Sequence, residues 1–183
     1  LQRVEGGRAN LCLVASAARL RRAGGGLPEF LREIAAETPP LAALVAGARI
    51  LGARPRAIAR IPYGFVHRPA HGDPEGLVRV GDQAGVVPSF CGDGMAMALY
   101  GGIAAANALC AGEAAAAHHA RLAGAIGPAI GRARALERLT EGRLCRAAIV
   151  AGAGIAPILA TGFAAATRVP EHAWRDAVRG CAP

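Results

Sequence analysis

The sequence predicts an α/β chain, more closely an α+β fragment, in which short strands and short helices come first and long helices follow. Three observations support this fold class. Extended apolar runs separated by glycine and proline occupy the first part of the chain. A glycine-rich loop that contains acidic residues spans residues 79–97. Beyond it, long runs of small apolar residues without charge are typical of packed helices.

The first 50 residues are expected to form a hairpin and two short helices. Residues 1–15 contain Gly6-Gly7 between two extended runs, which indicates a hairpin turn, and residues 19–26 form a basic, glycine-rich link. Pro28 is suited to the first turn of a helix, and apolar residues follow at helical spacing until Pro39-Pro40 ends it. A second short helix is expected over residues 41–48.

Two further strands are expected before the long helices. Residues 56–63 alternate in a way that favours a strand, and residues 77–80 form a short apolar run that ends abruptly at Gly81-Asp82. A helix is predicted over residues 94–109, with Asp93 as its N-cap.

The last third of the chain is expected to be helical. Residues 113–142 have helical character that Gly127-Pro128 weakens, and an apolar helical stretch and a tail follow from Arg146. Residues 147–167 contain no charge over 21 positions. Because this run is mostly alanine and glycine and contains Pro157, it predicts a buried or interfacial helix, with peripheral membrane contact as the second interpretation.

The glycine-rich loop combines an acid at the end of a short apolar run with a helix N-terminus, which offers unpaired N–H groups to a ligand. Its residues are Gly81-Asp82-Gln83-Ala84-Gly85, Pro88 and Gly92-Asp93-Gly94-Met95-Ala96-Met97-Ala98-Leu99. This pattern resembles the second flavin-binding motif of FAD-dependent oxidoreductases of the p-hydroxybenzoate hydroxylase fold type, and most closely their geranylgeranyl reductase-like branch. Residues 10–13 and 58–64 look like the strands that precede the motif in this branch.

The resemblance implies a cofactor, a site and a division of the chain. The expected cofactor is FAD, with the ribityl chain on the acid and the flavin ring against the loop and helix start. Residues 1–76 would end a substrate-binding domain, 77–112 would hold the FAD motif and helix, and 113–183 would form a C-terminal helical region. The expected cofactor-binding residues are Gly81, Asp82, Pro88, Gly92, Asp93, Gly94 and Met95.

The resemblance also implies a reaction class, with the catalytic residues unassigned. The first hypothesis is an oxidoreductase that reduces double bonds of an isoprenoid or another lipid-like, apolar substrate, with NAD(P)H as a candidate electron donor. A flavin monooxygenase acting on an aromatic or polyketide substrate shares the same motif. Because no dinucleotide-binding turn precedes Leu1, a truncated, non-catalytic fragment of a longer flavoprotein is the third hypothesis.

Composition excludes several other classes. The net charge is +8, and all 21 basic residues are arginine. The arginines are scattered and aromatic residues are few, so nucleic-acid binding is not expected. The absence of lysine excludes a Schiff base within this sequence. Five cysteines without metal-ligand spacing indicate reduced thiols and a cytoplasmic setting.

Other chemistry-bearing residues have simpler interpretations. Cys91 lacks an adjacent base and is expected to fill space, and Tyr63 is expected to be a half-buried aromatic that contacts substrate or flavin if it has a role. His67, His71 and Asp73 are expected in a solvated loop.

Two sequence patterns are not expected to bind a ligand. His118-His119 is expected to be exposed, without a metal partner. The turn-like segment 152–157 has Pro157 where a dinucleotide turn needs glycine, and no acid follows at the required distance.

Overall fold

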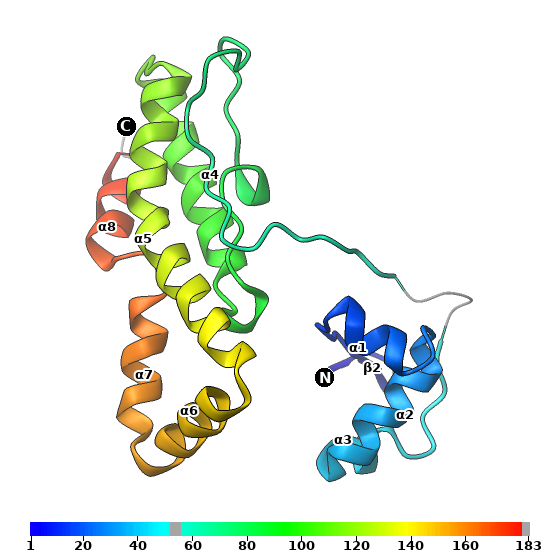
Figure 1. The fold of residues 1–183 in the computed structure, drawn as a ribbon. Coiled ribbons are helices and arrows are strands. Elements are labelled where there is room, and N and C mark those ends of the chain that lie inside the picture. Colours follow the sequence, from blue (N-terminus) through cyan, green and yellow to red (C-terminus); the bar gives the residue numbers. More distant parts are fainter. Residues whose placement is uncertain (52–55, 181–183) are drawn as a thin grey trace. The chain divides into compact units, whose positions relative to one another are not determined.

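The computed structural model describes residues 1–51 and 56–180 (Figure 1). Helices make up 59% of the residues, and the one sheet among the described residues has two strands, so the α+β character is confirmed in this coarse form. The chain divides into two compact units, Leu1–Ala59 and Arg60–Pro183. Each unit has its own packing.

The first unit joins a hairpin to three short helices. Strands β1 (Gln2–Val4) and β2 (Arg8–Asn10) pair antiparallel, with Val4 opposite Arg8, around a turn in which Gly6 and Gly7 both have φ of 68°. This confirms the predicted hairpin, since only glycine adopts such dihedrals readily. Helix α2 (Leu27–Glu37) follows the prediction, whereas helix α3 (Pro39–Val45) begins two residues earlier than expected, because Pro39 and Pro40 form its first turn.

The basic link expected over residues 19–26 is in large part a helix. Helix α1 (Ala17–Arg22) begins at Ser16, whose hydroxyl accepts a hydrogen bond from the Arg19 N–H at 3.2 Å. Arg19 also forms ion pairs with Glu33 and Glu37 of α2. The N-cap and these ion pairs stabilise a helix that the glycines beside it obscured in the sequence.

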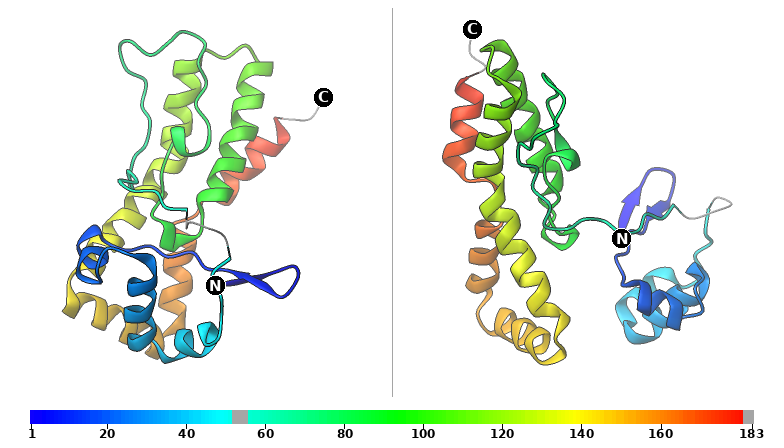
Figure 2. Two further views of the ribbon diagram at one scale, coloured as in Figure 1. Left: turned by 90° about the vertical axis from the view of Figure 1, so that its right-hand side faces the viewer. Right: turned by 45° about the horizontal axis from the view of Figure 1, so that its top comes forward.

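The second unit is built on two long helices, α4 (Gly94–Cys110) and α5 (Ala115–Glu141), which lie side by side (Figures 1 and 2). Helix α8 (Glu171–Arg179) packs on α4, and helices α6 (Arg143–Ile155) and α7 (Pro157–Ala166) follow the end of α5. The predicted helices over 94–109 and 113–142 are confirmed, and α5 continues through Pro128.

The core of the second unit is the face of α5 that meets α4. Its most deeply buried residues, each 3% exposed or less, are Leu122, Ile126, Ala129, Ile130 and Ala133. The small side chains in this set let the two helices approach closely. This close approach gives a dense core although the chain is rich in alanine. Met97 and Tyr100 of α4 close the core from the other side.

The two strands expected over residues 56–63 and 77–80 are absent from the described part of the chain, so this prediction was wrong. The one piece of pairing here is the bridge between Val66 and Gly85, flanked by a bond from the His67 N–H to the Ala84 carbonyl at 2.8 Å. A strand needs a neighbour along its length. The Arg79 N–H instead donates to a histidine side chain of α5, so residues 77–80 stay irregular.

Among the helices of the described residues, none combines the length and the apolar character needed to cross a membrane.

Candidate functional site

The acidic end of the loop is an exposed turn. Val80 is extended, and Gly81 then turns the chain with φ of 57° into the 3-10 turn η1 (Gly81–Gln83). This turn packs against α4, where a Cβ on Gly81 would lie 3.9 Å from that of Ala98. Asp82 is exposed, and its carboxylate has no partner among the described residues. The expected strand end is therefore a turn, but the carboxylate is free to accept hydrogen bonds.

The middle of the loop is anchored by Pro88, which is fully buried. After it comes the 3-10 turn η2 (Ser89–Cys91), and Gly92 ends this turn in the left-handed region with φ of 73°. The hydroxyl of Tyr63 is hydrogen-bonded to that of Ser89, so segment 60–66 is held against the loop. Tyr63 is half-buried, as expected. A side chain at position 92 would be strained, so glycine sets the direction in which the chain enters α4.

The start of α4 has no side-chain cap, which corrects the expected role of Asp93. Asp93 occupies the N-cap position, but its side chain accepts a hydrogen bond from the Thr167 hydroxyl at 3.3 Å and pairs with Arg168 at 3.5 Å. These partners lie more than 70 positions later in the sequence. The N–H groups of Gly94 and its two successors are thus left without a capping side chain and can face an anionic or polar ligand.

The surface beside this helix start is apolar. Met95 is 80% exposed and Leu99, one turn later on the same face, is 66% exposed. Phe90 of η2 is 54% exposed. Such side chains provide contact area for a flat aromatic ring or for an apolar substrate.

Cys91 lies next to this surface, in surroundings that disfavour its thiolate form. Burial, together with the nearby carboxylate of Asp93, raises the pKa of the Cys91 thiol. A thiol with a raised pKa stays protonated at neutral pH and reacts slowly. This agrees with its interpretation as a small, space-filling residue.

A cavity of about 440 Å³ adjoins the helix start. It lies between the first turn of α4 and the link that leads into α8, and Asp93, Met97, Arg168, Glu171 and Trp174 line it together with two small residues. Of the seven residues expected to bind the cofactor, Asp93 is the one that lines this cavity. Of the others, Pro88 is fully buried beneath the loop, and the remaining five belong to the loop and the helix start described above.

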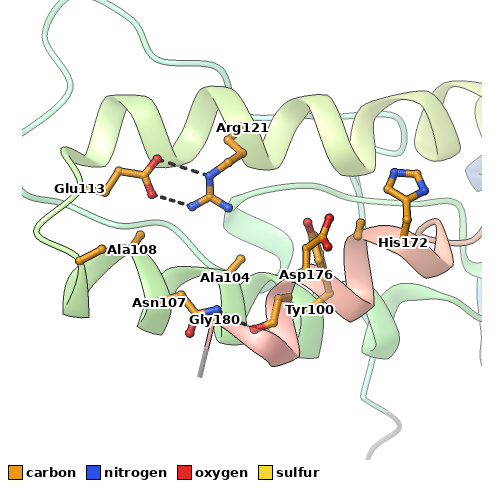
Figure 3. A pocket seen from close by; sticks show the side chains of 12 residues that line it. Tyr100, Ala104, Asn107, Ala108, Glu113, Arg121, His172, Asp176 and Gly180 are labelled. Carbon is orange, nitrogen blue, oxygen red and sulfur yellow. Dashed lines mark hydrogen bonds and ion pairs between the residues drawn. The ribbon is translucent and has the colours of Figure 1, made fainter. Parts of the chain in front are cut away.

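A second cavity, of about 480 Å³, lies between α4, α5 and α8 (Figure 3). Arg121 and Glu113, which line it, form an ion pair at 2.6 Å, while the lining residues Asp176 and His172 come from α8. Burial raises the pKa of Tyr100, which also lines this cavity. No sequence motif indicated this cavity, because its walls come from segments up to 80 residues apart.

The histidines near the start of α5 are buried, which corrects the expectation that they are exposed. His118 is 0% and His119 is 4% exposed. The ring of His119 contacts that of His67 edge-on at 4.6 Å, and its Nε2 accepts the Arg79 N–H at 2.9 Å. His119 is therefore neutral, with its proton on Nδ1. The sequence offered one signal of this burial: the alanines on both sides of the histidine pair are small and apolar, as in a packed helix face.

In the loop in front of these histidines, His71 and Asp73 are exposed as expected, but His67 is not. His67 is largely buried, and its Nε2 lies 3.4 Å from the Asp73 carboxylate, which also pairs with Arg79 at 3.3 Å. The Ala70 N–H donates to Asp73 and, with Arg79 as a smaller contribution, lowers the pKa of the Asp73 carboxyl. Among the described residues, no group of three or more His, Cys, Asp or Glu side chains is arranged to hold a metal ion.

Acidification should destabilise the second unit through these histidines. Burial, followed by nearby positive charge from Arg121 for His118 and from His67 for His119, lowers the pKa of both side chains. A histidine in the unfolded chain has a pKa of about 6.5, so as the pH falls the unfolded chain takes up protons before the folded protein does. The free energy of unfolding should be highest above that pH, fall as the pH drops through it, and level off below the folded pKa values.

The measurement is urea unfolding between pH 5 and pH 8, monitored by Trp174 fluorescence. His118→Leu removes one of these titrating groups and should flatten the pH dependence. Among the described residues neither ring nitrogen of His118 has a hydrogen-bond partner, so the substitution breaks no hydrogen bond there. His71→Gln, in an exposed part of the loop, is the matched control and should leave the dependence unchanged. An unaltered slope in His118→Leu would contradict the assignment.

Comparison with protein-family models, curated proteins and solved structures finds no match to this chain.

Proposed function

We propose that this chain carries the second flavin-binding motif of an FAD-dependent oxidoreductase, which reduces double bonds of an isoprenoid or another lipid-like substrate. The observation that supports it best is the exposed, unpaired carboxylate of Asp82, presented beside a glycine-rich loop and an uncapped helix start. The resemblance of residues 81–99 to the motif supplies the identity of the cofactor.

The residues present fit FAD at several points. Asp82 can accept hydrogen bonds from ribityl hydroxyls, and a charged acceptor makes such bonds worth about 1.5–3 kcal/mol. Gly92 has no side chain to keep a ring away from the backbone, and the first N–H groups of α4 favour a polar ring edge. The carboxylate of Asp93 also lies at this helix end, but Thr167 and Arg168 hold it and offset its charge.

The chain's own contribution would be binding and orientation. Pro88 and the Tyr63–Ser89 hydrogen bond fix the loop, Asp82 would hold the ribityl chain, and Met95 and Leu99 would cover the ring and exclude water. Bound FAD would supply the hydride chemistry, with NAD(P)H as the proposed electron donor. The apolar side chains at the helix start favour a lipid-like substrate over a charged one.

The first test is the visible absorption spectrum of the protein expressed from its complete coding sequence, after desalting. A retained flavin spectrum that NADH or NADPH bleaches under anaerobic conditions is expected. A colourless protein that added FAD does not reconstitute would overturn the proposal and favour a non-catalytic fragment. Oxygen consumption with a hydroxylated product would replace the reductase with the monooxygenase alternative.

Asp82→Ala should weaken FAD binding roughly 10- to 150-fold, the equivalent of about 1.5–3 kcal/mol. The measurement is fluorescence titration of the apoprotein with FAD. Asp82→Asn keeps an acceptor oxygen and should lose less. The matched control is Glu75→Ala, which removes another exposed acid seven positions before Asp82 and outside the motif. This variant should bind FAD as the unaltered protein does. Equal affinity in Asp82→Ala would remove Asp82 from the site.

A further inference from the structure

The hairpin of α6 and α7, joined at Ala156, exposes large apolar side chains. Leu144 is 87%, Ile155 is 86% and Ile158 is 78% exposed, and Val150 is 67% exposed. No described residue of unit 2 covers them. Singly exposed apolar residues are ordinary, but several on one two-helix element form a patch of the kind that binds a partner.

The apolar side chains of α6 share one face. Leu144, Ala148, Ala151 and Ile155 recur at intervals of four, three and four, and all four are exposed. This spacing aligns residues along one side of a helix. Ile158 begins the exposed side of α7, where Thr161 donates its hydroxyl to the Ile158 carbonyl at 2.9 Å. The Thr161 hydroxyl therefore has its hydrogen-bond acceptor within the helix and needs no water molecule as a partner.

Positive charge surrounds this uncharged surface. Residues 132–168 contain six arginines against two glutamates, and Arg134 pairs with one of these, Glu137. Arg138 and Arg146 are exposed at the border of the hairpin, and Arg168, which pairs with Asp93, is exposed at its other end. The whole chain carries +8. Apolar side chains within a cationic border match a bilayer that has anionic headgroups above its acyl chains.

The hairpin has the dimensions of an element that lies on a membrane. Helix α6 has 13 residues and α7 has 10, which at about 1.5 Å per residue are roughly 20 Å and 15 Å long. Each is shorter than the roughly 30 Å hydrocarbon layer. The two helices lie at the end of α5 remote from the α4–α5 turn, as the views in Figures 1 and 2 agree. They can therefore contact a flat surface while the α4–α5 turn stays away from it.

We propose that the α6–α7 hairpin docks on an anionic lipid bilayer, with Leu144, Ile155 and Ile158 in the acyl boundary and the bordering arginines at the headgroups. The proposal rests on this surface alone and does not depend on flavin binding. If both proposals hold, the enzyme lies on the bilayer in which its lipid-like substrate is dissolved.

The test is co-sedimentation of the full chain with vesicles of phosphatidylcholine alone and of phosphatidylcholine mixed with phosphatidylglycerol. Binding is expected to the mixed vesicles and to weaken as salt rises, since headgroup attraction is screened. Ile155→Glu combined with Ile158→Glu should lower the partition coefficient by at least about tenfold, because two apolar side chains no longer enter the bilayer. Arg138→Glu combined with Arg146→Glu should abolish the preference for anionic vesicles.

The matched control is Leu109→Glu, on α4, where the side chain is 63% exposed. It adds one negative charge away from the hairpin, as Ile155→Glu alone adds one on it, and should leave sedimentation with vesicles unchanged. Circular dichroism of each variant verifies that it is folded. The proposal is overturned if the chain stays in the supernatant with both vesicles, or if the hairpin variants bind as the control does. It is also overturned if the hairpin variants convert a lipid-free dimer into a monomer, which would identify a second copy as the occupant.

Discussion

Ile130→Ala should lower the free energy of unfolding of the second unit by about 2–5 kcal/mol, the largest effect expected for a single substitution. Ile130 is 0% exposed in the middle of α5 and belongs to the cluster that holds α4, α5 and segment 84–87 together. The substitution removes three buried carbon atoms and leaves a cavity. Alanine is itself a good helix former, so the loss would come from packing and not from helix propensity.

The measurement is urea unfolding followed by the fluorescence of Trp174, the single tryptophan of the chain. Its ring packs on the core and lies edge-on to Tyr100 at 5.5 Å, so it reports on this unit. Ile158→Ala is the matched control, since its side chain is 78% exposed, and should change stability by less than about 0.5 kcal/mol. Equal effects of the two substitutions would show that Ile130 is not in the core.

Gly85→Ala should cost about 1–3 kcal/mol through overpacking. A Cβ at position 85 would lie 2.7 Å from the Cδ1 of Ile126 and 2.9 Å from that of Ile130, and both of these side chains are buried. Gly85 also forms the bridge to Val66, so its backbone cannot easily retreat. The strain would act on the segment that leads from η1 to Pro88, and hence on the candidate flavin site.

A double substitution separates this mechanism from a general loss of stability. Ile130→Val removes the Cδ1 that a new Cβ would meet, so Gly85→Ala should cost less in the Ile130→Val background than in the unaltered protein. Gly131→Ala is the control: it lies in α5 next to Ile130 with nothing within 4 Å, and should be neutral or stabilising by up to about 1 kcal/mol. Strictly additive effects would contradict the contact between Gly85 and Ile130.

The loop at residues 81–95 shows how far a motif can be followed from the sequence. Its glycines occupy the turns that the pattern required, with positive φ at Gly81 and Gly92, because the cost of such dihedrals is local and selects glycine. Asp82 could be recognised as a candidate ligand in the same way. The partners of Asp93 could not, since Thr167 and Arg168 are brought to it by the fold of α7 and α8 around α4.

Local signals in the sequence were sufficient to predict the hairpin at Gly6-Gly7, the helix that begins near Pro28, and the long helices α4 and α5. In each case the deciding interactions are turn dihedrals, helix propensity and spacing of apolar residues, all within a few positions of one another. The tertiary structure alone decided the failure of segments 56–63 and 77–80 to form strands, because a strand requires a partner elsewhere in the chain. It also decided the burial of His118 and His119 and the cavity between α4, α5 and α8. These features depend on which distant segments meet, and the pattern of residues along one segment does not contain that information.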